Sequence, residues 1–388
     1  MKVALVHDYL KEFGGAERVL LALHEIWPRA PVYVAFCDWK KMGQAAEKFR
    51  HWDIRPSWVQ RCWLVKKFYS PLRFVLPLIW GSFDFREFDI VISSSSWYMP
   101  KAIKVKPPTK HLCYLHAVPR YLYGFKTAVE WQRYWPVRIY ATIVNHFLRL
   151  YDFKTSQRVD YFIANSKTTA ERIKKFYRRE ATVIYPPVDL PKAAADSLTL
   201  RVKKPKPEGF SSAAAREGKY FLAGGRMAAA KHFDLAILAC NKLNLPLKIY
   251  GSGRLEKELR RLAGPTVEFL GYVSDEKLAE LYAGCQAYIF PTEDEELGMV
   301  ALEAMSYGKP VIGLRSGGLR ETIIEGKTGV FFEEPTVESL VKGIKGIKGI
   351  NFKPEDCRRQ ARKFGKERFK REILEFLDSH GFKTDFHR

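Results

Sequence analysis

The chain twice repeats an alternation of short apolar runs and amphipathic helical segments, and this pattern limits the possible folds most. The runs of the first half are KVALV from Lys2, PVYVAF from Pro31, FDIVIS from Phe88, HLCYLH from His111, YFIANS from Tyr161 and TVIYPPV from Thr182. The second half holds YFLAGG, LKIYGSG, VEFLGYV, AYIFPT, PVIGL and GVFF. Strands that alternate with helices pair in parallel, because a crossover helix returns the chain to the same edge of the sheet. The sequence therefore predicts an α/β protein with two Rossmann-like domains.

The two series are separated by a segment of different composition. Between Leu190 and Gly218 the chain is rich in Lys, Pro, Ala and Ser, and the apolar periodicity disappears. We predict an N-terminal domain over residues 1–195, a linker over 196–218 and a C-terminal domain over 219–353. Residues 354–388 read as a basic amphipathic helical segment, which we expect to pack across both domains.

Net charge indicates the kind of partner. The chain has 65 Lys and Arg against 43 Asp and Glu, a formal charge of +22, so its surface should attract anions. Nucleic acid, anionic lipid and phosphorylated small molecules all satisfy this condition. The six cysteines form no CxxC pair, which favours reduced thiols over a zinc site. His7 and Asp8 interrupt the first apolar run, so we expect no signal peptide and a cytoplasmic location.

Two cations follow the first strand of the second series. Arg226 comes directly after YFLAGG, and Lys231 stands at the expected start of the helix that contains HFDLAILACNKL. Cations beside a helix N-terminus can bind a diphosphate, although residues of this type are also often only solvated.

A second motif lies between the strand AYIFPT and the helix MVALEAMSYG. Gly298 precedes this helix, so the backbone N–H groups of Met299 and Val300 can face an anion. Glu295 can stabilise the helix dipole or contact a ligand. Glu303 lies among apolar residues of the helix, and a carboxylate there requires a hydrogen-bonding partner.

These motifs resemble those of the retaining GT-B glycosyltransferases of family four, which use a nucleotide-diphosphate sugar. The resemblance rests on GGRMAAAKHFDLAI, GSGR, the stretch from VEFLGYV to GGLRETI, and the N-terminal Gly-Gly loop. The N-terminal runs HDYLKEFGGAERVL, CYLHAVPRY and ANSKTTAERIKKFYRREATVIYPPVD are similar to a subgroup that includes O-antigen mannosyltransferases. The resemblance implies two Rossmann-like domains that face each other across a cleft, with a C-terminal helix returning to the first domain.

The resemblance also implies roles for residues of the second domain. Arg226 and Lys231 match the pair that neutralises the donor diphosphate. Glu303 matches the carboxylate that holds the ribose hydroxyls, and Glu295 the one that contacts the transferred sugar. Three residues match the segment around the base: Tyr272, Val273 and Asp275. Asp275, with Ser274, could instead cap the next helix.

In the first domain, Gly14 and Gly15 match the loop that approaches the donor diphosphate and sugar, where a side chain would block access. His116 matches the active-site histidine near the transferred sugar. Tyr9 and Arg120 stand on loops that should face the acceptor. The chain departs from the family at Leu297, where Phe is usual, at the alanines between Arg226 and Lys231, and at HAVPRY. No departure removes a charged donor contact.

The function implied is transfer of a hexose, with retention and without a metal or other cofactor, to a saccharide or lipid-linked acceptor in cell-surface polysaccharide synthesis. Mannose from GDP-mannose is the donor we expect. A UDP-sugar-dependent glycosyltransferase or a nucleotide-sugar epimerase of the same fold is the first alternative. A basic nucleic-acid-binding protein is the more distant alternative, because the sequence signatures of zinc fingers, RNP motifs and basic zippers are missing.

The segment from His51 to Phe85 mixes aromatic side chains, Trp63 and Trp80 among them, with Arg and Lys. This mixture is typical of an interfacial membrane surface. The run SWVQRCWLVKKFY is apolar on nearly every side of a helical wheel, so part of it can equally be core. With the first interpretation, the protein would be peripheral on the anionic inner face of the plasma membrane.

Overall fold

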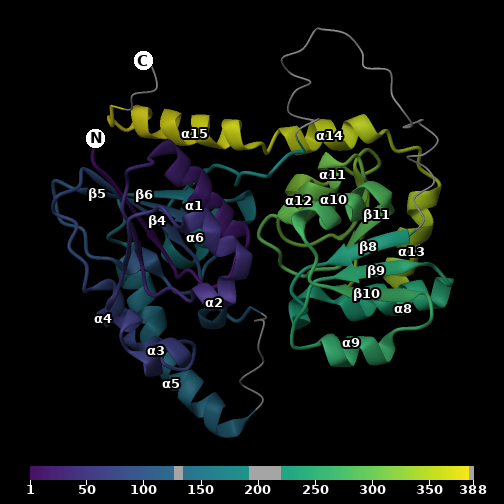
Figure 1. Ribbon diagram of the computed structural model, residues 1–388, viewed down its shortest axis with the longest axis horizontal. Helices are drawn as coiled ribbons and strands as arrows, with labels where there is room; N and C mark the ends of the chain where they lie inside the picture. Colours follow the sequence, from purple (N-terminus) through teal and green to yellow (C-terminus); the bar gives the residue numbers. More distant parts are fainter. Residues whose placement is uncertain (126–133, 192–219, 384–388) are drawn as a thin grey trace. The chain divides into compact units, whose positions relative to one another are not determined.

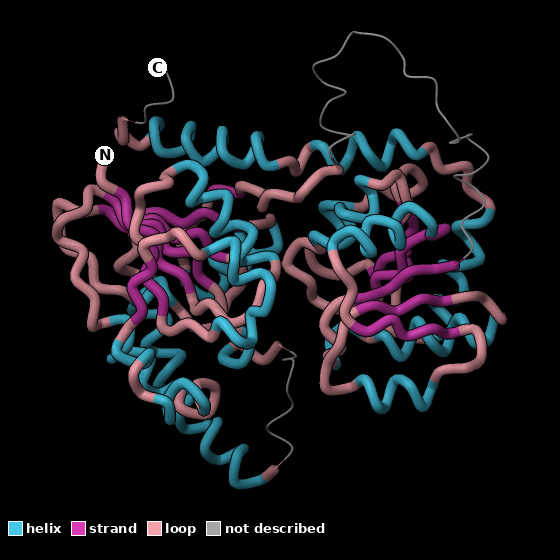
Figure 2. The backbone as a smooth tube through the Cα atoms, viewed as in Figure 1, coloured by secondary structure: helices cyan, strands magenta, loops and turns pink. Residues whose placement is uncertain are grey.

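The computed structural model describes residues 1–125, 134–191 and 220–383, which form two compact units (Figure 1). Met1–Phe125, Glu130–Pro187 and Lys366–Arg388 belong to unit 1, and Val188–Gly365 belongs to unit 2. The predicted linker, residues 196–218, lies outside the described residues. Each unit is built around one parallel sheet, as the alternating pattern predicted (Figure 2).

The sheet of unit 1 has seven parallel strands in the order β3-β2-β1-β4-β5-β6-β7. Their bounds are Val3–His7 (β1), Val32–Val34 (β2), Ile54–Pro56 (β3), Ile90–Ser95 (β4), Lys110–Leu115 (β5), Tyr161–Ala164 (β6) and Thr182–Val183 (β7). Strand β3 was not predicted, because it is short, lies at the sheet edge and ends in a proline. The strand order reverses between β1 and β4, and ligands bind at such a switch point in open parallel sheets.

The helices of unit 1 are α1 (Gly15–Ile26), α2 (Trp39–Met42), α3 (Trp63–Lys67), α4 (Leu76–Trp80), α5 (Trp135–Ser156), α6 (Lys167–Tyr177) and α15 (Lys366–Ser379). Helices α1 and α15 cover one face of the sheet, where Leu20 and Leu23 share a core with Phe369 and Ile373 (Figure 1). Lys366 and Lys370 place their Nζ atoms 2.9 and 2.6 Å from the Glu25 carboxylate at the edge of this contact. The expected return of a C-terminal helix to the first domain is therefore confirmed.

The sheet of unit 2 has six parallel strands in the order β10-β9-β8-β11-β12-β13. Their bounds are Tyr220–Gly224 (β8), Leu247–Tyr250 (β9), Val267–Gly271 (β10), Cys285–Phe290 (β11), Val311–Leu314 (β12) and Gly329–Phe332 (β13). All six coincide with the apolar runs of the second series. The order reverses between β8 and β11, which places the loops after these two strands at the same edge of the sheet.

The helices of unit 2 are α8 (Phe233–Leu243), α9 (Glu256–Leu262), α10 (Asp275–Gly284), α11 (Met299–Ser306), α12 (Leu319–Thr322), α13 (Val337–Lys348) and α14 (Pro354–Arg362). Helices α8 and α13 bury Ile237 and Ile344 in one core with β9 and β12. Helix α14 packs on α11. The basic segment from Pro354 is thus two helices, one in each unit.

The aromatic and basic segment over residues 51–85 separates into core and surface. Val65, Leu76, Ile79 and Trp80 are buried in unit 1, and Trp80 Nε1 donates to the Tyr98 carbonyl at 2.7 Å. Trp63 is instead 67% exposed. The core interpretation thus holds for part of the segment, because its short helices turn one side to the sheet and the other to solvent. The membrane interpretation of the exposed part stays a prediction.

Candidate functional site

The predicted donor residues of unit 2 gather at the carboxyl edge of β8 and β11. Arg226 is exposed in the loop after β8. Lys231 ends a 3-10 turn, Ala229–Lys231, and α8 begins only at Phe233. The expected helix start at Lys231 is therefore two residues early, because His232 adopts a left-handed conformation (φ 47°) that separates the turn from the helix. Lys231 still projects from the mouth of a strand-to-helix connection.

Lys231 and Glu295 form an ion pair that joins the two loops. Lys231 Nζ lies 2.7 Å from Glu295 Oε2, and the side chains are 27% and 21% exposed. The same ammonium group lies 5.4 Å from the centre of the Phe290 ring, at the end of β11. A hydrogen bond from Glu293 N to the Ala230 carbonyl, at 3.1 Å, ties the loops together beside this pair. Two residues predicted from separate motifs are thus in direct contact.

Gly298 precedes α11, as predicted, and has a φ of 83°. A Cβ atom at this position would come within 2.6 Å of Leu319 Cδ2, so glycine is required by both conformation and space. Helix α11 begins at Met299, and the N–H groups of Met299 and Val300 have no acceptor within the helix. These groups and the helix dipole make a favourable position for an anion. Leu297 is buried, so its side chain faces the core of unit 2.

Glu303 has the partner that its apolar surroundings required. Tyr282 Oη donates to Glu303 Oε2 at 3.1 Å and lies 3.0 Å from Tyr250 Oη. Tyr288 Oη in turn donates to the Gly224 carbonyl at 2.9 Å, next to the loop that carries Arg226. Burial raises the pKa of Tyr282 well above its usual value, so its phenol remains a donor. This tyrosine cluster holds the Glu303 carboxylate at one position and was not predicted.

The turn between β10 and α10 carries Tyr272, Val273 and Asp275. The Tyr272 side chain is 82% exposed, and Asp275 is the first residue of α10. Ser274 is the N-cap of α10, and its Oγ accepts from Lys277 N at 3.2 Å. Capping is thus performed by Ser274, and a role for Asp275 in base recognition stays a prediction.

Two pairs of glycines bring four loops of unit 2 into backbone contact. A Cβ on Gly317 or Gly318 would lie 2.2 Å from the Glu295 carbonyl oxygen or 2.1 Å from that of Glu296. Added Cβ atoms on Gly251 and Gly253 would lie 2.0 and 2.4 Å from the carbonyl oxygens of Gly225 and Met227. The runs GSG and SGG were the available signal, since glycine permits close backbone approach. They set the positions of the loops that carry Glu295 and Arg226.

In unit 1, a buried network connects His116 to the loop of Gly14 and Gly15. His116 Nε2 lies 2.8 Å from Ser94 Oγ, which lies 3.0 Å from His7 Nδ1. His7 Nε2 lies 3.4 Å from Glu17 Oε1, and Gly14 N donates to Glu17 Oε2 at 2.8 Å. Parallel pairing of β1, β4 and β5 brings these residues to adjacent positions. Gly14 is also the N-cap of α1, which begins at Gly15.

Burial and the network both limit the state of His116. Burial lowers the pKa of His116 to about 3, so its imidazole is neutral near pH 7. Ser94 Oγ links the His7 and His116 rings, and its single hydrogen can be donated to only one of them. His7 and Ser94 were missed, although a histidine that ends the apolar strand VALVH was a signal for the first.

Of the two residues predicted to face an acceptor, Arg120 lies in a short turn and Tyr9 is buried. Arg120 begins a short 3-10 turn, Arg120–Leu122. Tyr9 is only 5% exposed, its ring stacks on Phe36 at 5.2 Å, and its hydroxyl accepts from Trp97 Nε1 at 2.9 Å. This position argues against direct acceptor contact by Tyr9, because the aromatic cluster at the end of β1 encloses its ring.

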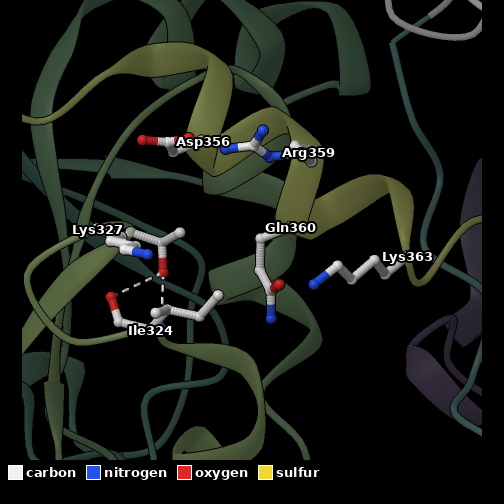
Figure 3. Close-up of a pocket in the computed structure, with 7 residues that line it drawn as sticks. Ile324, Lys327, Asp356, Arg359, Gln360 and Lys363 are labelled. Carbon is white, nitrogen blue, oxygen red and sulfur yellow. Dashed lines mark hydrogen bonds and ion pairs between the residues drawn. The ribbon is translucent and has the colours of Figure 1, made fainter.

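A separate cavity of about 190 Å³ lies beside α14 (Figure 3). Lys327, Arg359, Gln360 and Lys363 are among its lining residues, and none of the predicted donor residues lines it. Within residues 1–125, 134–191 and 220–383, no group of three His, Cys, Asp or Glu side chains is arranged to hold a metal ion. Among the described helices, none combines the length and apolarity needed to cross a bilayer.

Comparison with known families matches both halves of the chain. Residues 13–192 match the family described as Glycosyltransferase Family 4, and residues 206–364 match Glycosyl transferases group 1. The sulfoquinovosyl transferase SQD2 of Arabidopsis thaliana is 34% identical over 128 residues, which are 32% of this chain and 25% of that protein. The first curated relatives are thus matched over well under half of their own length, from 25% to 41%.

Solved structures resemble the chain over nearly all of its length. The lipopolysaccharide outer core galactosyltransferase WaaB, in its apo form, has a TM-score of 0.63 at 18% identity, covering 98% of this chain and 100% of that one. HepE of Anabaena, in complex with UDP and glucose, has a TM-score of 0.65 at 18% identity with the same coverage. At this level of identity the likeness establishes the GT-B fold.

Proposed function

We infer that this chain, a GT-B protein that joins a glycosyltransferase family 4 domain to a group 1 domain, is a retaining hexosyltransferase. We propose mannose from GDP-mannose as the transferred group and its donor. The observation that carries the proposal is the Lys231–Glu295 contact at the carboxyl edge of β8 and β11, next to the N-terminus of α11. A cation, a carboxylate and helix N–H groups there suit a diphosphate joined to a sugar.

The proposed chemistry is electrostatic. The bond between the anomeric carbon and the diphosphate oxygen breaks, a bond from that carbon to an acceptor hydroxyl forms, and the departing phosphate takes the hydroxyl proton. Arg226, Lys231 and the start of α11 stabilise the negative charge that develops on the leaving diphosphate. We propose that this set performs the step without a metal ion. Attack on the face that the diphosphate leaves would retain the anomeric configuration.

Glu303 and Glu295 are proposed to position the donor. Glu303, held by Tyr282, would accept hydrogen bonds from the ribose hydroxyls. Glu295 would contact hydroxyls of the sugar, so donor binding has to break its ion pair with Lys231. In unit 1, Gly14, Gly15 and His116 are assigned to the donor diphosphate and sugar, and the neutral imidazole of His116 suits a hydroxyl rather than a phosphate.

A uridine donor is the second candidate, because HepE, which has the same fold, is described in complexes with UDP and with UDP-glucose. Thermal-shift measurements with GDP and UDP distinguish the two. We expect GDP to raise the melting temperature more than UDP. A larger shift with UDP would assign the base as uracil and leave the transferase proposal intact.

We propose a saccharide or lipid-linked saccharide as acceptor, in cell-surface polysaccharide synthesis on the cytoplasmic side of the membrane. The net charge of +22 supports an acceptor and a surface that are anionic.

The test of the transferase proposal is a donor screen that measures hydrolysis or transfer with several nucleotide sugars. Arg226→Ala and Glu303→Ala should each remove most of the activity and leave the fold intact. Arg261→Ala, in α9, is the matched control and should have wild-type turnover. If both site variants turn over a nucleotide sugar at the wild-type rate, the assigned site is wrong.

A further inference from the structure

Helix α5 presents apolar side chains to solvent along its outer face. Trp135, Ile139, Ile143, Phe147 and Leu150 are 72%, 54%, 55%, 66% and 58% exposed. Spacings of four, four, four and three residues place them on one side of the helix. The opposite side of α5 packs against unit 1, since Ala141, Asn145, Leu148 and Asp152 are buried. A helix on the surface of a soluble domain normally turns charged and polar residues outward, so this face requires another explanation.

A second exposed apolar surface adjoins α5. In the segment 58–78, Trp63, Leu64, Phe68, Phe74 and Leu78 are 67%, 47%, 43%, 50% and 66% exposed. Arg73 donates to Asn145 Oδ1 of α5 at 2.9 and 3.2 Å, and Tyr140 Oη donates to the Pro71 carbonyl. Helices α3 and α4 accordingly lie beside α5 at one end of unit 1 (Figure 1). We call the exposed apolar side chains of segment 58–78 and α5 the apolar face.

The exposed charges of segment 58–78 and of the described helix α5 have a single sign. Residues 58–78 contain no Asp or Glu and four basic residues, Arg61, Lys66, Lys67 and Arg73. The one acidic residue of α5, Asp152, is fully buried and pairs with Lys101 Nζ at 2.8 Å.

On the exposed side of α5, Arg138, Arg149 and Lys154 carry the charge. Lys67 Nζ lies 5.6 Å from the Trp63 ring centre and 5.3 Å from that of Phe68, so basic and aromatic groups are interleaved.

We propose that the apolar face seats unit 1 on the surface of an anionic lipid bilayer, with α5 as an inserted element beside segment 58–78. Aromatic and aliphatic side chains would enter the boundary between headgroups and acyl chains, and the surrounding Arg and Lys would contact lipid phosphates. Within segment 58–78 and the described helix α5, no acidic side chain is exposed, which favours lipid over a second protein surface, because such a surface usually carries both signs. This inference deepens the proposed function, since it places the protein where a lipid-linked acceptor lies.

Vesicle sedimentation of the full chain, without donor or acceptor, tests the proposal. We expect binding to vesicles of phosphatidylcholine with an equal part of phosphatidylglycerol, and much weaker binding to phosphatidylcholine alone. Phe147→Gln and Trp63→Gln should each weaken binding about tenfold, because each removes a large apolar group from the lipid boundary. Lys67→Glu should weaken it about fivefold or more, with the effect lost at high salt.

Matched controls lie in unit 2. Leu262→Gln replaces an apolar side chain that is 40% exposed, and Arg261→Glu reverses an exposed charge beside it. Both should bind vesicles like the wild type, and circular dichroism checks that every variant is folded.

Equal binding of the wild type, Phe147→Gln and Trp63→Gln to anionic vesicles would overturn the proposal. So would a concentration-dependent dimer that Phe147→Gln abolishes, with no vesicle binding, because a second copy would then cover the face. Vesicle binding and nucleotide-sugar turnover are separate readouts. Loss of the transferase proposal therefore leaves this inference standing, and its own failure leaves the donor site unaffected.

Discussion

Lys231 Nζ and Glu295 Oε2 lie 2.7 Å apart although the two residues are 64 positions apart in the sequence. Both side chains belong to the proposed donor site, and without a ligand they pair with each other. The pair is about three-quarters buried, which makes the contact stronger than an exposed ion pair. A bound diphosphate would replace the Glu295 charge beside the ammonium group and release the carboxylate toward the sugar.

A double-mutant cycle on this pair tests the shared role. We expect Lys231→Ala to lower kcat/KM about a hundredfold, as expected when a group that stabilises a developing charge is removed. Glu295→Gln should also lower it, and the double variant should lose less than the product of the two effects. Steady-state kinetics with the preferred donor give all four values. Fully multiplicative losses would mean that the two side chains act independently.

Tyr282→Phe should weaken donor binding through Glu303. The phenol donates to Glu303 Oε2, and a hydrogen bond to a charged group contributes about 1.5–3 kcal/mol, so we expect KM for the donor to rise about tenfold or more. Isothermal titration with the nucleoside diphosphate checks the same effect without turnover. Tyr220→Phe, which removes a phenol that donates to the Leu281 carbonyl at 3.0 Å, is the control and should bind the nucleotide normally. Normal nucleotide binding by Tyr282→Phe would contradict a positioning role.

Ser94→Ala should impair the positioning of His116 without weakening donor binding. Without the hydroxyl, His116 loses its contact at 2.8 Å and the orientation of its ring, so kcat should fall about tenfold while KM for the donor is unchanged. Ser94→Thr keeps the hydroxyl and should recover much of the rate. Equal loss in both variants would indicate a general packing defect at the end of β4.

Gly14 and Gly317 differ in the space that is available for a side chain. A Cβ on Gly14 would meet only Glu17 Oε2, at 3.5 Å, and the φ of –146° is accessible to any residue. Gly14→Ala should therefore change the free energy of unfolding by about 1 kcal/mol or less and still lower transfer. Gly317→Ala should destabilise by more than about 1 kcal/mol, since its φ is 55° and its Cβ would clash with the Glu295 carbonyl. Urea unfolding with activity assays compares them, and wild-type transfer by a stable Gly14→Ala would argue against ligand access at this loop.

Acidification should destabilise the protein through two buried histidines. Burial lowers the pKa of both His111 and His116 from 6.5 to about 3. Between these values the unfolded chain binds protons that the folded chain does not, so stability is full above about pH 6.5 and falls as the pH decreases toward 3. From pH 7 to pH 5 each histidine should remove about 2 kcal/mol.

Replacement of one histidine measures its contribution to the pH dependence of stability. His111→Gln should show a smaller loss of stability between pH 7 and pH 5 than the wild type, measured by denaturant unfolding at both values. A wild type that becomes more stable over this decrease in pH would contradict the neutral state of the two rings.

The sequence predicted much of the fold because its strands are defined locally. Runs such as YFLAGG and AYIFPT are apolar on both faces, and Gly298 marks a helix start through its own backbone preference. Strand β3 was not predicted, since three residues that end in Pro56 have no usable periodicity. The sequence also indicated that Glu303 needs a partner, because a carboxylate on an apolar helix is unstable without one.

The sequence by itself therefore determined the two parallel sheets, the loops that carry Arg226, Lys231 and Glu295, and the net positive charge from which anionic partners are predicted. Only the tertiary structure decided which residues meet. Tyr282 of α10 reaches Glu303 of α11 through tertiary packing, and Ser94 joins His7 to His116 through the pairing of strands far apart in the chain. It also decided that Trp80 is core while Trp63 and the outer face of α5 are exposed. Contacts of this kind depend on sheet register and packing, which local residue preferences do not encode.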